Sequence, residues 1–274
     1  VAAAEKGATT TLKGIYKGTV GGTSWSAIDA TAIGAKTVDA LFWAGSDLFA
    51  LAHVESTGIY SLYYSNGTTA FASTGLTALT SPVLGVAHDG ATYWALVSST
   101  TTLTAKIYSG TAAALTTDST PAGGKNFVGI AVDSSNKVLA TTTDGYLYTY
   151  SAGWTSAVAS SDVELGVLAE VQASPTQKRL ILGKYNSGYG YYEYIASSNT
   201  LYNGNDADNA AFVPTASSYT TTIYTKPVRA MYYSATHSKL FIGLAAQGTD
   251  TYALYSNTYD PTAASKYWSG WTAE

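Results

Sequence analysis

Short apolar runs separated by polar turns recur along the chain, and five of them open with one shared pattern. In each, an apolar residue is followed by any residue and then by Ala or Gly, after which a mostly apolar stretch begins. The five copies are Val38–Leu41, Val83–Val86, Phe127–Ile130, Val167–Glu170 and Val228–Met231. Repetition at intervals of this length is typical of folds built from equivalent structural units.

Each copy is followed by three further stretches with the character of strands. A second apolar run comes after a polar turn, at 48–51, 93–96, 138–140, 179–182 and 240–244. A third, aromatic stretch carries an aligned tyrosine: Tyr64, Tyr108, Tyr150, Tyr194 and Tyr255. A weaker fourth stretch completes the unit, and no run of ten residues keeps the apolar period of a helix. We therefore predict that each unit is a sheet of four short antiparallel strands.

Sheets of this size cannot bury both faces alone, so neighbouring sheets are expected to stack face to face. The small third residue of the shared pattern suits a position where the sheets converge and large side chains would collide. This predicts that the first strand of each unit is the innermost one. The small residues concerned are Ala40, Gly85, Gly129, Ala169 and Ala230.

With these features the chain resembles the β-propeller superfamily, at the level of architecture and from about residue 12 onward. The third unit, Val128–Tyr150, is similar to an NHL-type or lactonase-type blade. The resemblance implies an all-β, five-bladed β-propeller of four-stranded antiparallel sheets, with residues 1–274 as a single domain. It also implies that an N-terminal strand completes the last blade, a role that we assign to residues 23–29. The alternative is a six-bladed ring with a partial blade.

The composition of the chain mainly excludes certain classes of partner. Of the 274 residues only 12% are charged, and the net charge is -4. Nucleic acid is therefore not an expected partner, because phosphate binding needs a basic excess. Cysteine is absent, which rules out disulfides and Cys-ligated zinc, and no apolar run reaches the length of a transmembrane helix. A low-charge surface rich in Ser, Thr and Tyr favours an extracellular, cell-surface or periplasmic monomer.

Catalytic motifs are not found in the sequence. His53, His88 and His237 occupy different places in the repeat, and no metal-binding spacing, nucleophile elbow or P-loop occurs. We therefore expect no metal and no cofactor. The alternative is a lactonase-like or glycosidase-like hydrolase, whose carboxylates would converge on the central channel. Its candidate acids are Glu55, Asp144, Glu164 and Asp250.

Positive residues recur just before the first strands. Lys36, Lys125 and Lys226 each lie two residues ahead of the leading apolar residue, and Arg229 follows the last of them. In propellers, which this chain resembles, the link into the innermost strand lies on the face that carries binding sites. These residues could focus the field on an anionic ligand such as an acidic sugar. The alternative is that they are solvated residues that keep the protein soluble.

The long segment between Tyr194 and Val228 is a second candidate region, because loops of this length are often functional. It contains Tyr219 and Tyr224, two aromatic candidates for ligand binding. It also contains an Asn/Asp/Gly cluster at 203–209 whose oxygens resemble calcium ligands, although a solvated turn is the favoured interpretation.

Exposed aromatic rings would provide contact area for a sugar or a protein. Trp25, Trp154, Trp268 and Trp271 are candidates on outer strands, whereas Trp43 and Trp94 are expected to be buried between sheets. The favoured alternative for the candidates is that they too serve packing. Together these observations predict a non-catalytic binding or interaction propeller that recognises a carbohydrate or protein partner through its loop face.

Overall fold

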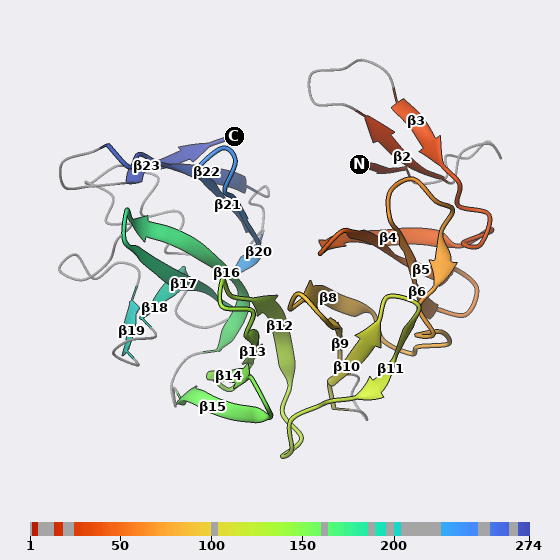
Figure 1. The fold of residues 1–274 in the computed structure, drawn as a ribbon, viewed down its shortest axis with the longest axis horizontal. Helices are drawn as coiled ribbons and strands as arrows, with labels where there is room; N and C mark the ends of the chain where they lie inside the picture. The colour runs from red at the N-terminus through yellow and green to blue at the C-terminus, as the bar shows by residue number, and fades with distance from the viewer. Residues whose placement is uncertain are drawn as a thin grey trace. The chain divides into compact units, whose positions relative to one another are not determined.

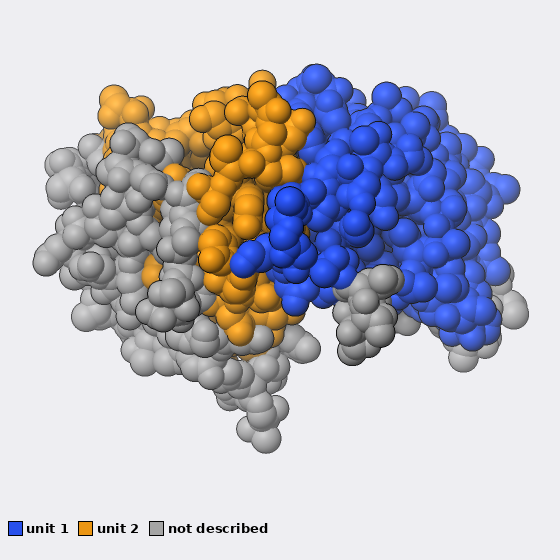
Figure 2. Space-filling model, turned by 90° about the horizontal axis from the view of Figure 1, so that it is seen from below, with its two compact units in different colours: residues 1–126 blue, residues 127–274 orange. Residues whose placement is uncertain are grey.

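The computed structural model describes residues 2–4, 14–18, 25–99, 104–159, 164–185, 190–195, 200–203, 226–245, 253–262 and 268–274. All regular elements among these residues are β-strands, and they contain no helix long and apolar enough to cross a membrane. The chain divides into two compact units, Val1–Asn126 and Phe127–Glu274, coloured blue and orange in Figure 2. Each unit is described by itself below.

The first unit contains two four-stranded antiparallel sheets (Figure 1). The strands of sheet one are β4 (Thr37–Ala44), β5 (Asp47–Val54), β6 (Ile59–Ser65) and β7 (Ala72–Ser73). Those of sheet two are β8 (Val83–His88), β9 (Tyr93–Val97), β10 (Lys106–Thr111) and β11 (Ala114–Asp118). In each sheet the strands pair in chain order, so the first strand lies at one edge and the fourth at the other.

The second unit contains three more sheets of the same kind. Sheet three consists of β12 (Phe127–Val132), β13 (Val138–Thr142), β14 (Tyr146–Tyr150) and β15 (Trp154–Ala159). Sheet four consists of β16 (Leu165–Ser174), β17 (Gln177–Lys184), β18 (Tyr191–Ile195) and β19 (Thr200–Asn203). Sheet five consists of β20 (Val228–Ser234), β21 (Lys239–Leu244), β22 (Ala253–Tyr259) and β23 (Trp268–Ala273). The prediction of five four-stranded antiparallel propeller blades is confirmed.

The shared sequence pattern coincides with an irregularity at the start of every first strand. The pairing with the second strand shifts register between Val38 and Ala40, and an equivalent shift recurs in the other four sheets. Such a β-bulge adds an unpaired residue and re-aims its side chain. The freely variable second residue of the pattern is therefore the bulged residue in β4, β8, β12 and β20. In β16 the shift lies earlier, between Leu165 and Leu168, and the second residue of the predicted copy, Leu168, is already paired with Leu182.

Neighbouring sheets within each unit meet at their first strands, as predicted. In the first unit β4 contacts β8, and in the second β16 contacts both β12 and β20 (Figure 1). Hydrophobic clusters fill the spaces between the sheets. One joins sheets one and two around Phe49, another joins sheets three and four around Leu147, and a third joins sheets four and five around Ile242.

The expected role of residues 23–29 in the last blade is wrong. β3 (Trp25–Ile28) pairs with β2 (Gly14–Gly18), which in turn pairs with β1 (Ala2–Ala4), in a separate three-stranded sheet. Sheet five has its own fourth strand, β23, which pairs with β22. The three-stranded sheet packs against sheet one, where Ile15 and Ile28 are buried against Leu48.

One expectation about tryptophan burial is also wrong: Trp43, expected to be buried, is 59% exposed. Trp268 and Trp271, candidates for an exposed binding surface, are buried, which agrees with the alternative that they pack in the core. The last two lie in β23 but pack into the cluster between sheets four and five, where the Trp268 indole nitrogen donates a hydrogen bond to the Gln172 carbonyl oxygen (3.1 Å). Trp94 is buried, as expected.

Candidate functional site

In every sheet the strands pair antiparallel in chain order, so two connections lie at the same end of the sheet. They are the hairpin between the second and third strands and the link that leads into the first strand. We call this end the link end. It is the end at which the first strand of every sheet has a register shift near its start, and the end at which the resemblance to propellers predicts a binding site.

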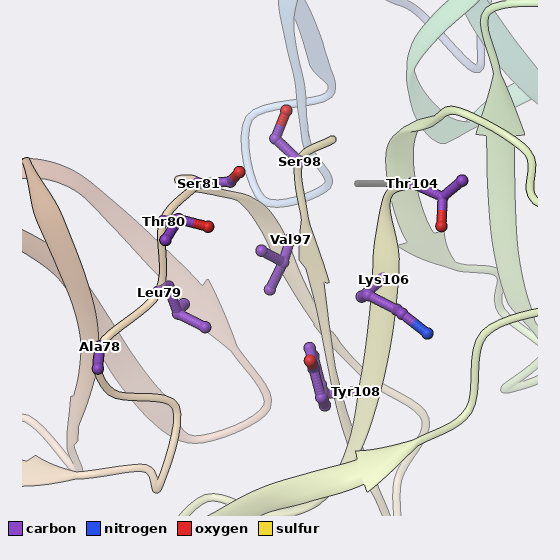
Figure 3. Close-up of a pocket in the computed structure, with 9 residues that line it drawn as sticks. All are labelled: Ala78, Leu79, Thr80, Ser81, Val97, Ser98, Thr104, Lys106 and Tyr108. Atoms are coloured by element: carbon purple, nitrogen blue, oxygen red, sulfur yellow. The ribbon is translucent and has the colours of Figure 1, made fainter. Parts of the chain in front are cut away.

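A pocket of about 330 Å³ opens at the link end in the first unit (Figure 3). One wall is the link from β7 to β8, and the other is formed by the end of β9 and the start of β10. Leu79 and Val97 project into the space between these walls (Figure 3). The lining residues are Ala78, Leu79, Thr80, Ser81, Val97, Ser98, Thr104, Lys106 and Tyr108.

The link that forms the first wall is held in a defined conformation. Tyr60 on β6 and Leu79 exchange two backbone hydrogen bonds, of 2.9 and 3.0 Å. Ala78 adopts φ = 56°, in the left-handed region that residues other than glycine rarely occupy. Because strained backbone of this kind persists only where the surroundings hold it, the shape of this wall is fixed by the fold.

The opposite wall supplies a charged group and an aromatic ring. The Lys106 ammonium donates a hydrogen bond to the Asp118 carboxylate (2.7 Å), and this bond raises the pKa of Lys106. The lysine therefore stays protonated at neutral pH. Tyr108 is half-buried and packs at the margin of the cluster between sheets one and two. Together with the hydroxyls of Ser81 and Ser98, these side chains present donors, acceptors and apolar surface to one small volume.

Sequence reasoning missed this pocket. Its residues come from three separate segments, in which Tyr108 is the aligned tyrosine and Ser81 has the repeat position that Lys36, Lys125 and Lys226 have in other units. That tyrosine was recognised as a repeat feature, but four equivalent tyrosines occur elsewhere and nothing in the sequence singled it out.

The predicted positive residues lie at the link ends of both units. Lys36 donates a hydrogen bond to the Ile33 carbonyl oxygen (3.3 Å), and its ammonium lies 5.5 Å from the centre of the Tyr63 ring. Lys125 is half-buried just before β12. Lys226 lies just before β20, and its carbonyl oxygen accepts a hydrogen bond from the Gly190 amide (3.1 Å). The idea that the three lysines share one face stays a prediction, because they belong to different units.

Arg229 is the bulged residue of β20 and is exposed. Its guanidinium carbon lies 4.5 Å from the centre of the Tyr185 ring, at the link end of sheet four. The structure thus brings Arg229 and Lys226 to neighbouring positions at this end of the second unit. Tyr219, Tyr224 and residues 204–209 of the predicted calcium loop lie outside the described residues.

The candidate catalytic acids are distributed over both units. Glu55 accepts a hydrogen bond from the Thr37 hydroxyl (2.6 Å) in sheet one, while Asp144 and Glu164 lie at the link ends of sheets three and four. Asp250 is outside the described residues. Nearby in sheet one, a His53 ring nitrogen lies 2.7 Å from an Asp39 carboxylate oxygen. Across the described ranges, no group of three or more His, Cys, Asp and Glu residues is arranged to hold a metal ion.

Comparison with known proteins yields likeness of structure only. No protein-family model matches the chain, and no curated protein matches it. A solved protein from Lactobacillus plantarum has a TM-score of 0.56 at 14% identity, with 98% of this chain and 80% of that chain covered. The structure of YCF48 bound to D1 peptide has a TM-score of 0.52 at 10% identity, covering 92% and 71%.

An extracellular domain from B. thetaiotaomicron has a TM-score of 0.49 at 13% identity, and the match covers 86% of this chain and 33% of that chain. At these levels of identity a likeness establishes the fold and leaves activity and ligand open. Sequence pattern, sheet topology and structural likeness agree that the chain is a β-propeller.

Proposed function

We propose that this protein is a non-catalytic propeller, displayed outside the cytoplasm, that binds a saccharide in the link-end pocket of its first unit. The observation that supports this proposal most directly is the make-up of the pocket. A volume of about 330 Å³ is lined by serine and threonine hydroxyls, one tyrosine, one lysine and three aliphatic side chains. Ligand sites characteristically combine apolar surface with a few converging polar groups.

A saccharide matches these groups better than an apolar ligand would. Each sugar hydroxyl both donates and accepts hydrogen bonds, and Ser81, Ser98 and Thr104 can do the same. The CH face of a sugar ring can pack against Tyr108, whose flat side chain gives contact area at low cost in conformational entropy. Lys106 lines the pocket with its alkyl chain, while its ammonium, bound to Asp118, points away from Leu79 and Val97 (Figure 3).

A protein partner is the other ligand class that the sequence predicted. The solved complex of YCF48 with a peptide shows that a propeller of related shape binds one. In the present chain, however, the pocket is small and rich in hydroxyls, which favours a sugar over an extended peptide. The location outside the cytoplasm rests on the low proportion of charged residues.

Isothermal titration calorimetry with a panel of neutral oligosaccharides and of short peptides tests the proposal. At least one saccharide is expected to bind, and Tyr108→Leu is expected to lower its affinity by about tenfold or more, as removal of an aromatic anchor does. Tyr150→Leu is the matched control, because Tyr150 is the aligned tyrosine of sheet three and does not line the pocket. The proposal fails if only peptides bind, or if the two variants weaken saccharide binding equally while their melting temperatures match.

A further inference from the structure

The first strand of sheet five exposes a row of side chains beside the Arg229 guanidinium. Along β20, Arg229, Ala230 and Tyr232 are exposed, whereas Val228 is buried and Met231 and Tyr233 pack against the core cluster. Tyr232 is 64% exposed, which is unusual for so large a ring. Arg229 breaks the strict alternation of the strand because the bulge between Val228 and Ala230 turns it toward the exposed side.

The Tyr185 ring also holds the Arg229 side chain in position. The guanidinium lies over the Tyr185 ring in a cation–π contact, with 4.5 Å between the guanidinium carbon and the ring centre. The Tyr185 amide donates a hydrogen bond to the Glu164 carbonyl oxygen (3.1 Å), which fixes the backbone that carries the ring. The Tyr185 ring lies beside Gly166, where a side chain would approach it. A guanidinium supported by an aromatic ring loses less conformational freedom when it binds a ligand than a freely rotating one does.

The chemistry of this row matches one class of ligand. An arginine fork binds a carboxylate through two parallel hydrogen bonds, and Lys226, three residues earlier, adds positive charge at the same end of the sheet. Tyr232 lies three residues beyond Arg229, a separation of about 10 Å along a strand. Ala230, between them, has only a methyl group and leaves the intervening surface open.

We propose that Arg229 and Tyr232 form a binding site for an acidic saccharide, in which Arg229 binds a uronate carboxylate and Tyr232 stacks on a neighbouring sugar ring. Tyr185 is a positioning residue, because it acts on the ligand through Arg229. This site lies wholly in the second unit and does not depend on the pocket of the first.

Calorimetric titration with trigalacturonate, and with neutral galactotriose as the uncharged counterpart, tests this site in the full chain. Trigalacturonate is expected to bind, and its affinity should fall as salt is raised from about 0.1 M to about 1 M, because the Debye length shrinks from about 10 Å to about 3 Å. Arg229→Gln should weaken binding by tenfold or more, and Arg229→Lys should restore only part of the loss. Tyr232→Ala should weaken both trigalacturonate and galactotriose.

The matched control is Lys239→Gln, which removes one positive charge from the opposite end of the same sheet, where Lys239 pairs with Glu274 (3.7 Å). The affinity for trigalacturonate should be unchanged by it, and also by the pocket variant Tyr108→Leu. Tyr185→Leu should reduce affinity while Tyr185→Phe retains it, since the ring and not its hydroxyl supports Arg229. The proposal is overturned if trigalacturonate does not bind, if Arg229→Gln and Lys239→Gln weaken it equally, or if triglutamate competes as well as trigalacturonate.

Discussion

Gly129 on β12 lies against the carbonyl oxygen of Gly166 on β16, so closely that a Cβ atom at position 129 would overlap that oxygen. The same Cβ would stand 2.8 Å from a methyl carbon of Leu168. The Thr141 hydroxyl on β13 donates a hydrogen bond to the same Gly166 oxygen, so sheets three and four are also joined by a hydrogen bond at this point. This contact is the physical reason for the small residue at the third position of the repeated pattern, at least in sheet three.

Replacing Gly129 by leucine should therefore destabilise the protein. The expected loss is about 1–3 kcal/mol of unfolding free energy, the usual effect of overpacking, because the neighbouring atoms include backbone that cannot rotate away. Chemical denaturation measures it. Gly153→Ala is the control, since a Cβ there would meet nothing within 4 Å. If Gly129→Leu is as stable as the unmodified protein, the close packing of β12 against β16 at Gly129 is contradicted.

Lys184 gives the protein a specific dependence of stability on alkaline pH. It is 4% exposed, its ammonium lies 4.3 Å from the Tyr192 ring centre, and burial lowers its pKa from 10.5 to about 8. Between pH 8 and 10.5 the unfolded chain binds more protons than the folded one, so stability should rise with pH across this window, by up to roughly 3 kcal/mol. Below pH 8 Lys184 is protonated in both the folded and the unfolded protein, so burying its charge lowers the stability by the full amount.

The difference between unmodified protein and Lys184→Met isolates this effect, because groups common to both proteins cancel. Urea denaturation at several pH values should show a rise from pH 8 to 10 in the unmodified protein that is absent, or much smaller, in Lys184→Met. Parallel pH profiles in the two proteins would show that Lys184 keeps its ordinary pKa in the folded state.

The ion pair between Arg179 and Glu193 couples two strands of sheet four. The Arg179 Nη1 and Glu193 Oε2 atoms are 2.6 Å apart, and the Glu193 side chain is completely buried. Arg179→Met should cost about 3–5 kcal/mol, because it leaves a buried carboxylate without this cation. The double variant Arg179→Met/Glu193→Met should be more stable than Arg179→Met alone, since it removes the charge as well. A double-mutant cycle by chemical denaturation checks the prediction, and strictly additive losses would contradict it.

Calcium should have little effect on stability. The Asn/Asp/Gly cluster at 203–209 lacks the closing glutamate of an EF-hand loop, and its composition is typical of a solvated turn. Melting temperatures in millimolar calcium and in chelator should agree, because an ion whose Kd lies far above its concentration adds almost no stability. A clear rise with calcium would make the cluster a metal site.

The parts of the fold that the sequence predicted are those that repeat. The pattern at Val38, Val83, Phe127 and Val228 could be recognised because one packing constraint, the convergence of first strands, acts in every sheet. The N-terminal strand at 23–29 was predicted, but its partner was wrong because it was inferred by resemblance to ring closure, whereas burial of Ile15 and Ile28 against sheet one decides its place.

The candidate sites could be predicted only in part. Arg229 was recognised from its position next to a repeated element, but its partner Tyr185 lies in another sheet and has no sequence signal. The pocket combines Leu79, Val97 and Lys106, which only the packing of sheet two against the link brings together. Trp43 was misjudged because its neighbours are apolar, although it lies on the exposed side of β4.

A crystal structure of the protein with the tightest-binding neutral saccharide tests the central claim most directly. The account predicts electron density for the sugar between the Ala78–Ser81 link and the start of β10, with a ring face against Tyr108 and hydroxyls within hydrogen-bonding distance of Ser81 or Ser98. A saccharide bound elsewhere, with this pocket empty in the same crystal, would contradict it.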